Sequence, residues 1–228
     1  MFILHASSLA SAIGRNPFQS PSECFEYHNK KESKYGNKPE IYNKKLKDGQ
    51  KLETLVETIQ KEINEKVVRD DNKFIEEIQN TIREKCPKEI VKEAITIPQK
   101  IMGVEREKII VNQLDIIQSD KPIGKNINTK HGRIFLVGRL DGKKKKDGKI
   151  VEIKNRTRRL FNRIYPSEMC QLYAYMFLTN NKQIIHVECY NGEIKETLIE
   201  WNDNYWKGIL KDLEIYTKNF SKGLGLDK

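Results

Sequence analysis

The chain has 228 residues, of which 37% are hydrophobic and 32% are charged. This composition excludes an intrinsically disordered protein and supports one full hydrophobic core. Lys and Arg number 42 against 32 Asp and Glu, a net charge of +10. Such a surplus favours a polyanionic partner, either nucleic acid or an anionic membrane. An AT-rich coding sequence also inflates lysine, so charge alone does not decide between these explanations.

The sequence predicts an intracellular protein, in the cytoplasm or nucleus of a cell or of a virus-infected host, with no membrane partner. No apolar run approaches the roughly 20 residues that cross a bilayer. The N-terminal stretch MFILHASSLASA ends in small residues, but no Lys or Arg precedes its short apolar part, so we do not expect secretion. The four cysteines are widely spaced without a CxxC pair, which favours reduced thiols over disulfides or a metal-thiolate site.

The N-terminal segment over residues 5–30 predicts two helices. Ser7 or Ser8 is placed to cap the first, which Asn16-Pro17 ends. The run Ser20-Pro21-Ser22-Glu23 is typical of the start of the second.

A helical insertion is predicted over residues 34–97 of a single domain that spans residues 1–228. Residues 34–45 are polar and predict a loop, and residues 46–86 carry apolar side chains at helical spacing. A turn near residues 70–72 would divide this stretch into two antiparallel helices. The alternative is a coiled-coil interaction arm.

The second half of the chain alternates between helical and strand patterns. We expect a helix over residues 99–118, then strands over residues 133–140 and 149–154 that form a hairpin around the glycines of DGKKKKDG. The remaining predicted elements are a helix over 166–179, a hairpin of strands 183–190 and 193–200 around Asn191-Gly192, and a helix over 203–221. The pattern indicates a mixed α/β fold.

Three side chains around the predicted first hairpin have the chemistry of a metal site. Asp141 ends one strand, and Glu152 and Lys154 lie two apart on the next, so they face the same side while Ile153 points into the core. Two converging carboxylates can bind a hard cation such as Mg²⁺, and a lysine beside them can orient a water.

The same letters recur by chance in a chain rich in Glu and Lys. Glu193-Ile194-Lys195 repeats the pattern after a tight turn, but no aspartate lies on the strand before it. An exposed cross-strand ion pair is the expected role of that copy.

The first set resembles the signature of the PD-(D/E)XK nuclease superfamily, with Asp141 followed by Glu152-Ile153-Lys154. Gln171-x-x-x-Tyr175 and Gly103-x-x-x-Glu107 resemble the QxxxY and GxxxE motifs of the branch with RecB-type nucleases, lambda exonuclease and YqaJ-like viral recombinases. The opening ASSLASAIGRNPFQSPSE resembles the start of YqaJ-like proteins. Leu140 replaces the usual proline before the aspartate, and the cysteine triplet of the iron–sulfur subfamily is missing.

This resemblance implies a central mixed sheet flanked by helices and a DNA nuclease. The expected activity is end-directed exonuclease digestion, 5′ to 3′, in recombination or genome maintenance. Endonuclease activity on the same fold and a non-catalytic nucleic-acid-binding module are the alternatives. DNA ends or single strands would be the partners, with a single-strand annealing protein as a further one.

The resemblance also suggests a role for each residue of the site. Asp141, Glu152 and the Ile153 carbonyl would hold one or two Mg²⁺ or Mn²⁺ ions, and Glu107 would complete the metal site. Lys154 would position the water, with Gln171 as a further catalytic group. The predicted DNA-binding residues are Ser7, Ser8, Arg15, Arg156, Arg158, Arg159, Arg163 and Tyr175.

Overall fold

The structure is a computed structural model, and it describes residues 2–30, 40–66, 72–119 and 121–220. Its strands are β1 (Phe2–His5), β2 (Ile116–Gln118), β3 (Ile123–Thr129), β4 (Gly132–Gly138), β5 (Gly142–Lys144), β6 (Ile150–Asn155), β7 (Gln183–Tyr190) and β8 (Glu193–Glu200). Its helices are α1 (Leu9–Ala12), α2 (Pro21–Lys30), α3 (Leu52–Lys66), α4 (Asn72–Lys85), α5 (Lys88–Ala94), α6 (Ile97–Gln113), α7 (Pro166–Thr179) and α8 (Asp203–Phe220), with short 3₁₀ turns at Ala6–Ser8 and Glu40–Asn43.

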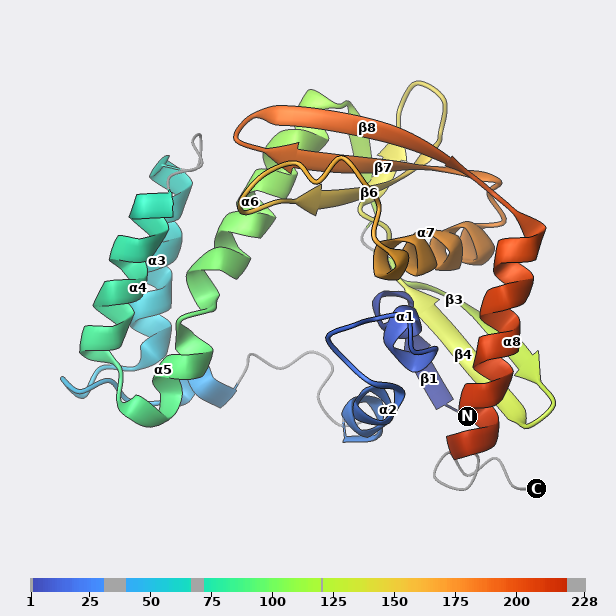
Figure 1. Cartoon of the computed structure of the whole chain (residues 1–228). Helices are drawn as coiled ribbons and strands as arrows, with labels where there is room; N and C mark the ends of the chain where they lie inside the picture. The colour runs from blue at the N-terminus through green and yellow to red at the C-terminus, as the bar shows by residue number, and fades with distance from the viewer. Residues whose placement is uncertain (1, 31–39, 67–71, 120, 221–228) are drawn as a thin grey trace.

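The strands form two mixed sheets, which makes the architecture mixed α/β as predicted. One sheet has the order β1-β4-β3, with β1 parallel and β3 antiparallel to β4. The other has the order β2-β5-β6-β7-β8, in which only β6 and β7 are parallel. Figure 1 shows α7 between the two sheets, with α8 along one side.

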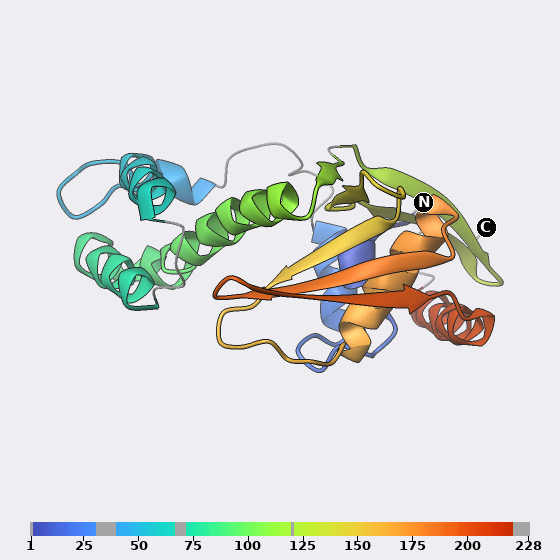
Figure 2. The same cartoon turned by 90° about the horizontal axis from the view of Figure 1, so that it is seen from above.

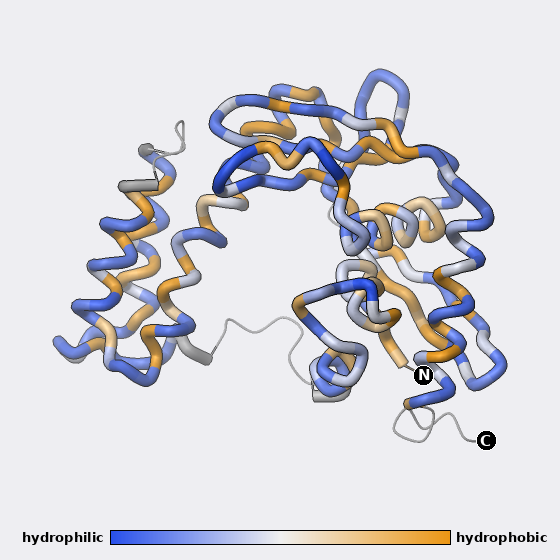
Figure 3. The backbone as a smooth tube through the Cα atoms, in the orientation of Figure 1, coloured by the Kyte–Doolittle hydropathy of each residue, from blue (hydrophilic) through white to orange (hydrophobic). Residues whose placement is uncertain are grey.

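The main core surrounds α7 because this helix is apolar on nearly every side. Leu172, Met176 and Ala174 of α7 are fully buried, together with Leu136 of β4 and Ile150 of β6. Figure 3 shows hydrophobic segments at α7 and β4 and a hydrophilic turn between β5 and β6. An all-round apolar helix needs cover on both faces, and the two sheets supply it.

The helices α3, α4 and α5 pack with the first half of α6 into a separate unit, the helical arm. They share their own core, which includes Leu52, Ile63, Ile82 and Met102. Figures 1 and 2 show this arm beside the α/β body, with α6 running from one to the other. The predicted helical pair is therefore confirmed, whereas residues 34–39 of the predicted loop and residues 70–71 of the predicted turn lie outside the described residues.

The second half of α6 covers the face of the large sheet that lies opposite α7. Ile110 and Val111 of α6 pack against Val151 and Ile153 of β6 in a third cluster. The helix ends at Gln113, earlier than predicted, because the chain turns at Asp115 with a φ of 53° and forms β2 instead.

The predicted hairpin of residues 133–140 and 149–154 is wrong. The strand β4 lies in the other sheet and pairs with β3 and β1, and β6 pairs instead with β5, a strand inside the segment expected to be a turn. The second hairpin, β7 with β8, is confirmed, with Asn191 and Gly192 at positive φ.

The remaining helices follow the prediction closely. The start of α2 has the expected reciprocal capping, in which Glu23 accepts from the Ser20 N–H and Ser20 Oγ accepts from the Glu23 N–H. All four cysteines are buried and unpaired. Among the described residues, no helix combines the length and apolarity needed to cross a membrane.

Candidate active site

Strand β6 places Glu152 and Lys154 on its α7 face and Ile153 on its α6 face, as the alternation predicted. The Lys154 ammonium donates to Gln171 Oε1 of α7 at 2.9 Å, whereas Ile153 is buried in the cluster beneath α6. Glu152 is only 3% exposed. A charged pair is therefore built into an apolar strand at the centre of the large sheet.

Asp141 reaches this pair by a different route from the predicted hairpin. The β5–β6 ladder ends at the Gly142–Val151 pair, and the Ile153 N–H donates instead to Asp141 Oδ2 at 2.6 Å. The carboxylate thus satisfies a backbone donor that the short strand β5 leaves open. Gly142 of β5 permits the close approach of β2, since a Cβ there would lie 2.5 Å from the Ile117 carbonyl oxygen.

A chain of hydrogen bonds fixes the lysine. Lys154 Nζ donates to Glu152 Oε1 at 2.6 Å and to Gln171, whose Nε2 donates to the Tyr175 hydroxyl at 3.1 Å. Gln171 and Tyr175 share a helix face, as their spacing predicted. Gln171 is therefore a neighbour of the ammonium group, and Tyr175 is a buried support behind it.

The positive charge of Lys154 does not fully compensate the buried Asp141 and Glu152 carboxylates. Burial raises the pKa of Glu152 to about 8 in spite of Lys154, and the nearby Asp141 carboxylate adds to the rise. Burial also raises the pKa of Asp141, against the opposing effects of the Ile153 N–H and Lys154. Glu152 Oε2 is buried without a hydrogen-bond partner among the described residues. A bound cation would relieve both groups.

Glu107 comes within electrostatic reach of this pair from α6. Burial raises its pKa and the Asp141 carboxylate raises it further, while Gln118 donates a long hydrogen bond of 3.5 Å. Glu105 instead faces Lys108 at 2.8 Å and Gln60 of the helical arm at 3.3 Å. The structure therefore places Glu107, rather than Glu105, toward the site, as predicted.

Asp141 and Glu152 lie together and Glu107 lies near them, but the three carboxylates do not converge on one point. Across residues 2–30, 40–66, 72–119 and 121–220, no group of three His, Cys, Asp or Glu side chains converges tightly enough to hold a metal ready-made. Gly103 of the GxxxE pattern accepts from Asn155 Nδ2 at 3.0 Å, and a Cβ there would meet no atom within 4 Å. Its role is a backbone contact, with no steric need for glycine.

The predicted arginine loop separates into two groups. Arg156 is buried against Glu168 at 2.5 Å and Glu188 at 2.6 Å, and it stacks on Phe161 at 4.5 Å. Its charge is thus neutralised inside the protein, so we correct its assignment from DNA contact to support of the loop. Arg163 is exposed and stacks on Tyr165 at 4.6 Å.

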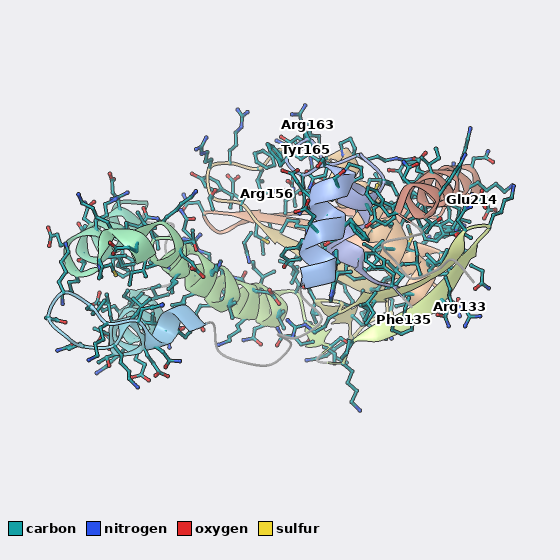
Figure 4. The ribbon with its side chains drawn as sticks, turned by 90° about the horizontal axis from the view of Figure 1, so that it is seen from below. Arg133, Phe135, Arg156, Arg163, Tyr165 and Glu214 are labelled. Atoms are coloured by element: carbon teal, nitrogen blue, oxygen red, sulfur yellow. The ribbon has the colours of Figure 1, made fainter. Side chains whose placement is uncertain are left out.

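Arg158 and Arg159 are exposed as well, and among the described residues neither pairs with a carboxylate. Figure 4 shows Arg163 beside Tyr165, with Arg156 nearby on the same side of the α/β body. The exposed arginines remain available to an anionic ligand.

The predicted DNA-binding residues near the N-terminus, Ser7, Ser8 and Arg15, do not form an open anion-binding site in this structure. Ser7 lies in a 3₁₀ turn, and Ser8 occupies the N-cap of the four-residue α1 as predicted, but its side chain makes no capping hydrogen bond. Arg15 pairs with Asp212 at 2.6 Å and lies over the Tyr205 ring at 5.3 Å. A terminal phosphate would have to displace that aspartate.

Sequence reasoning missed the buried partners Glu188 and Glu168. Glu188 lies beside Lys154 in the β6–β7 register, a pairing between segments far apart in the chain. The available signal was a pair of polar residues, His186 and Glu188, at alternate positions of an otherwise apolar strand. Glu168 could be found from its place in the capping box that opens α7.

Comparison with protein-family models and with curated proteins gives no match. Among solved structures, the chain is similar to the crystal structure of a protein named SSO0001, with a TM-score of 0.45 and 16% sequence identity. The alignment covers 78% of this chain and 87% of that one.

Proposed function

We propose that this protein is a metal-dependent nuclease that hydrolyses phosphodiester bonds in DNA. The observation that carries the proposal is the buried pair of Asp141 and Glu152 beside Lys154. The Glu152 carboxylate has an unpaired oxygen, and burial raises the pKa of both acids. Structural ion pairs are normally complete when buried, so an incomplete one marks a functional site.

The donor set fits a hard divalent cation. Its side-chain donors are carboxylate oxygens, which suit Mg²⁺ or Mn²⁺ better than softer metals. Asp141 and Glu152 would hold the ion together with the Ile153 carbonyl. Glu107, which lies within electrostatic reach of Asp141, would supply a further carboxylate. Such an ion polarises a phosphate and acidifies bound water.

The protein's own groups would orient the reactants. Lys154 is fixed by Glu152 and Gln171 at 2.6 and 2.9 Å, so its ammonium has a defined direction. It would stabilise charge that develops on a phosphate oxygen and hold a water by hydrogen bonding. Tyr175 would keep the Gln171 amide in place through its 3.1 Å hydrogen bond.

The charge of the protein supports a nucleic-acid substrate. The net charge is +10, and the exposed Arg158, Arg159 and Arg163 follow directly after the site strand. Arginine binds phosphate oxygens in a two-pronged geometry. The loop would therefore contact the DNA backbone next to the scissile bond.

The test is digestion of end-labelled linear DNA with Mg²⁺, Mn²⁺, Ca²⁺ or excess EDTA. We expect cleavage with Mg²⁺ or Mn²⁺, little with Ca²⁺, none with EDTA, and a loss with Asp141→Asn. The matched control is Asp147→Asn, because Asp147 is a nearby aspartate on the β5–β6 turn that pairs with Lys149. Cleavage that persists in EDTA would refute the proposal.

A closed circular substrate separates the two modes of cutting. The predicted end-directed enzyme, acting 5′ to 3′, leaves a closed circle intact, whereas an endonuclease on the same fold nicks it. Because Arg15 is paired with Asp212, the end-directed mode predicts that this ion pair opens when a 5′-phosphate binds. Digestion at equal rates with and without the 5′-phosphate would contradict that mode.

A further inference from the structure

A groove beside the candidate site has no role in the chemistry described so far. It runs between the loop after α1 and the loop that joins β6 to α7, with a volume of about 740 Å³. We call it the aromatic groove, and the residues that define it are Pro17, Phe18, Arg156, Phe161, Tyr165 and Glu168. Figure 4 shows where Arg156 and Tyr165 lie on the body.

The groove displays aromatic surface that the core does not use. Phe18 is 94% exposed, the most exposed large apolar side chain among the described residues. On the other wall, Phe161 and Tyr165 meet edge to face with their ring centres 5.3 Å apart. Together the three rings offer apolar surface to water, which a flat apolar ligand can cover.

The charges in the groove are neutralised by partners inside the protein. Arg156 pairs with Glu168 and Glu188, and Arg15, which also lines the groove, pairs with Asp212. The groove therefore suits a flat, uncharged ligand rather than a phosphate. Unpaired charge lies on the loop beside it, where Arg158 and Arg159 are exposed.

A nucleotide of a single strand has this distribution of properties. Its base is planar and uncharged, and its phosphates are anionic. Aromatic side chains bind unpaired bases by stacking, while nearby arginines bind the backbone. A base inside a duplex is already stacked on its neighbours and cannot enter.

We propose that the aromatic groove binds an unpaired nucleobase of single-stranded DNA, an inference that rests on the proposed nuclease function for its substrate. The groove is connected to the candidate site through two elements. Arg156 follows Lys154 by two residues on the chain, and Glu168 precedes Gln171 by about one turn of α7. A DNA strand with one base in the groove would therefore pass the candidate site, with its phosphates along the loop that carries Arg158, Arg159 and Arg163.

The test measures binding of a 16-nucleotide single strand and of a blunt duplex of equal length in Ca²⁺ buffer. A 2-aminopurine base reports stacking through its quenched fluorescence. Phe18→Ala should weaken single-strand binding by about tenfold and abolish quenching, as expected for the loss of one stacked base. Phe18→Trp should preserve both, because it keeps an aromatic ring at this position.

Two controls make the result specific. Duplex binding should change by less than about twofold in Phe18→Ala, because a paired base makes no stacking contact there. Leu198→Ala removes another exposed apolar side chain, 48% exposed on β8 and outside the groove, and should change neither affinity.

Four outcomes would overturn the inference. The first two are absence of single-strand binding by the natural protein and unchanged quenching in Phe18→Ala. The third is an equal loss of affinity for both DNA forms in Phe18→Ala. The fourth is a natural protein that forms a dimer and a Phe18→Ala variant that is a monomer with unchanged DNA affinity. The last would assign the groove to a second copy of the chain. Because binding is measured without cleavage, a protein that stacks the base but does not cut DNA would refute the nuclease proposal alone.

Discussion

Replacing Glu152 by glutamine should stabilise the metal-free protein, although it removes half of an ion pair. The carboxylate is 3% exposed, and burial raises its pKa from the ordinary 4.5 to about 8. A carboxyl group whose pKa is higher in the folded state lowers the free energy of unfolding progressively as the pH rises from 4.5 to 8. Glutamine has a similar shape and does not titrate.

The size of the effect follows from the two pKa values. The gain from Glu152→Gln should be less than about 1 kcal/mol at pH 5 and should reach about 3 kcal/mol at pH 7, at roughly 1.4 kcal/mol per pH unit. For a domain of this length, about 3 kcal/mol corresponds to roughly 6–12 °C in Tm. The retained amide oxygen still accepts from Lys154.

The assay is thermal unfolding in EDTA between pH 5 and pH 9, followed by tryptophan fluorescence. Trp201 and Trp206 pack against the main core, so the signal reports the α/β body. Added Mg²⁺ should raise the Tm of the natural protein at pH 8 and should have a smaller effect on Glu152→Gln, because the variant lacks one anionic ligand.

A second buried glutamate provides the matched control. Glu188 lies on the neighbouring strand, 3% exposed, but Arg156 pairs with it at 2.6 Å. Glu188→Gln should therefore destabilise the protein, by about 1–3 kcal/mol, because it leaves a buried cation less compensated. If both variants lower Tm alike at pH 8, the Glu152 carboxylate is already well satisfied and the metal-site reasoning fails.

Further predictions concern the two Glu-x-Lys copies and two glycines. In a single-turnover assay, Lys154→Ala should slow cleavage by roughly 10²-fold and Lys195→Ala by less than about threefold. The reverse order would show that the site lies on β8 and not on β6. Gly142→Ala should lower the free energy of unfolding by about 1–3 kcal/mol in urea, since its Cβ would collide with the Ile117 carbonyl. Gly103→Ala should instead add up to about 1 kcal/mol, because its surroundings are open and alanine favours the helix. A loss of stability in Gly103→Ala would show a steric role that the structure does not contain.

Local patterns predicted most of the helices and one hairpin correctly. The helix over 203–221 and the hairpin around Asn191-Gly192 depend on neighbouring residues, and both are confirmed within a few positions. The β4 strand has an equally clear pattern, but its partners were missed. Pairing of β1 with β4 joins residues about 130 positions apart, and no local signal specifies it.

The candidate site shows the same division. Alternation along β6 correctly predicted that Glu152 and Lys154 share a face. The proximity of Asp141 to this pair was also predicted, but from the wrong strand pairing; the short strand β5 inside a lysine-rich turn produces it. That Arg156 is buried against two glutamates was not predictable, because both partners belong to other elements.

The helix α6 belongs to two hydrophobic cores at once. Its 17 residues extend about 25 Å, with Met102 in the core of the helical arm and Ile110 in the cluster beneath the large sheet. Gly103 lies between these two, and Glu107 follows it by one turn. If the arm opens as an independent cooperative unit, the boundary of hydrogen-exchange protection falls near Gly103. Glu107 would then stand on the first turn that stays folded, so the local stability of the arm would set how firmly that carboxylate is held toward Asp141.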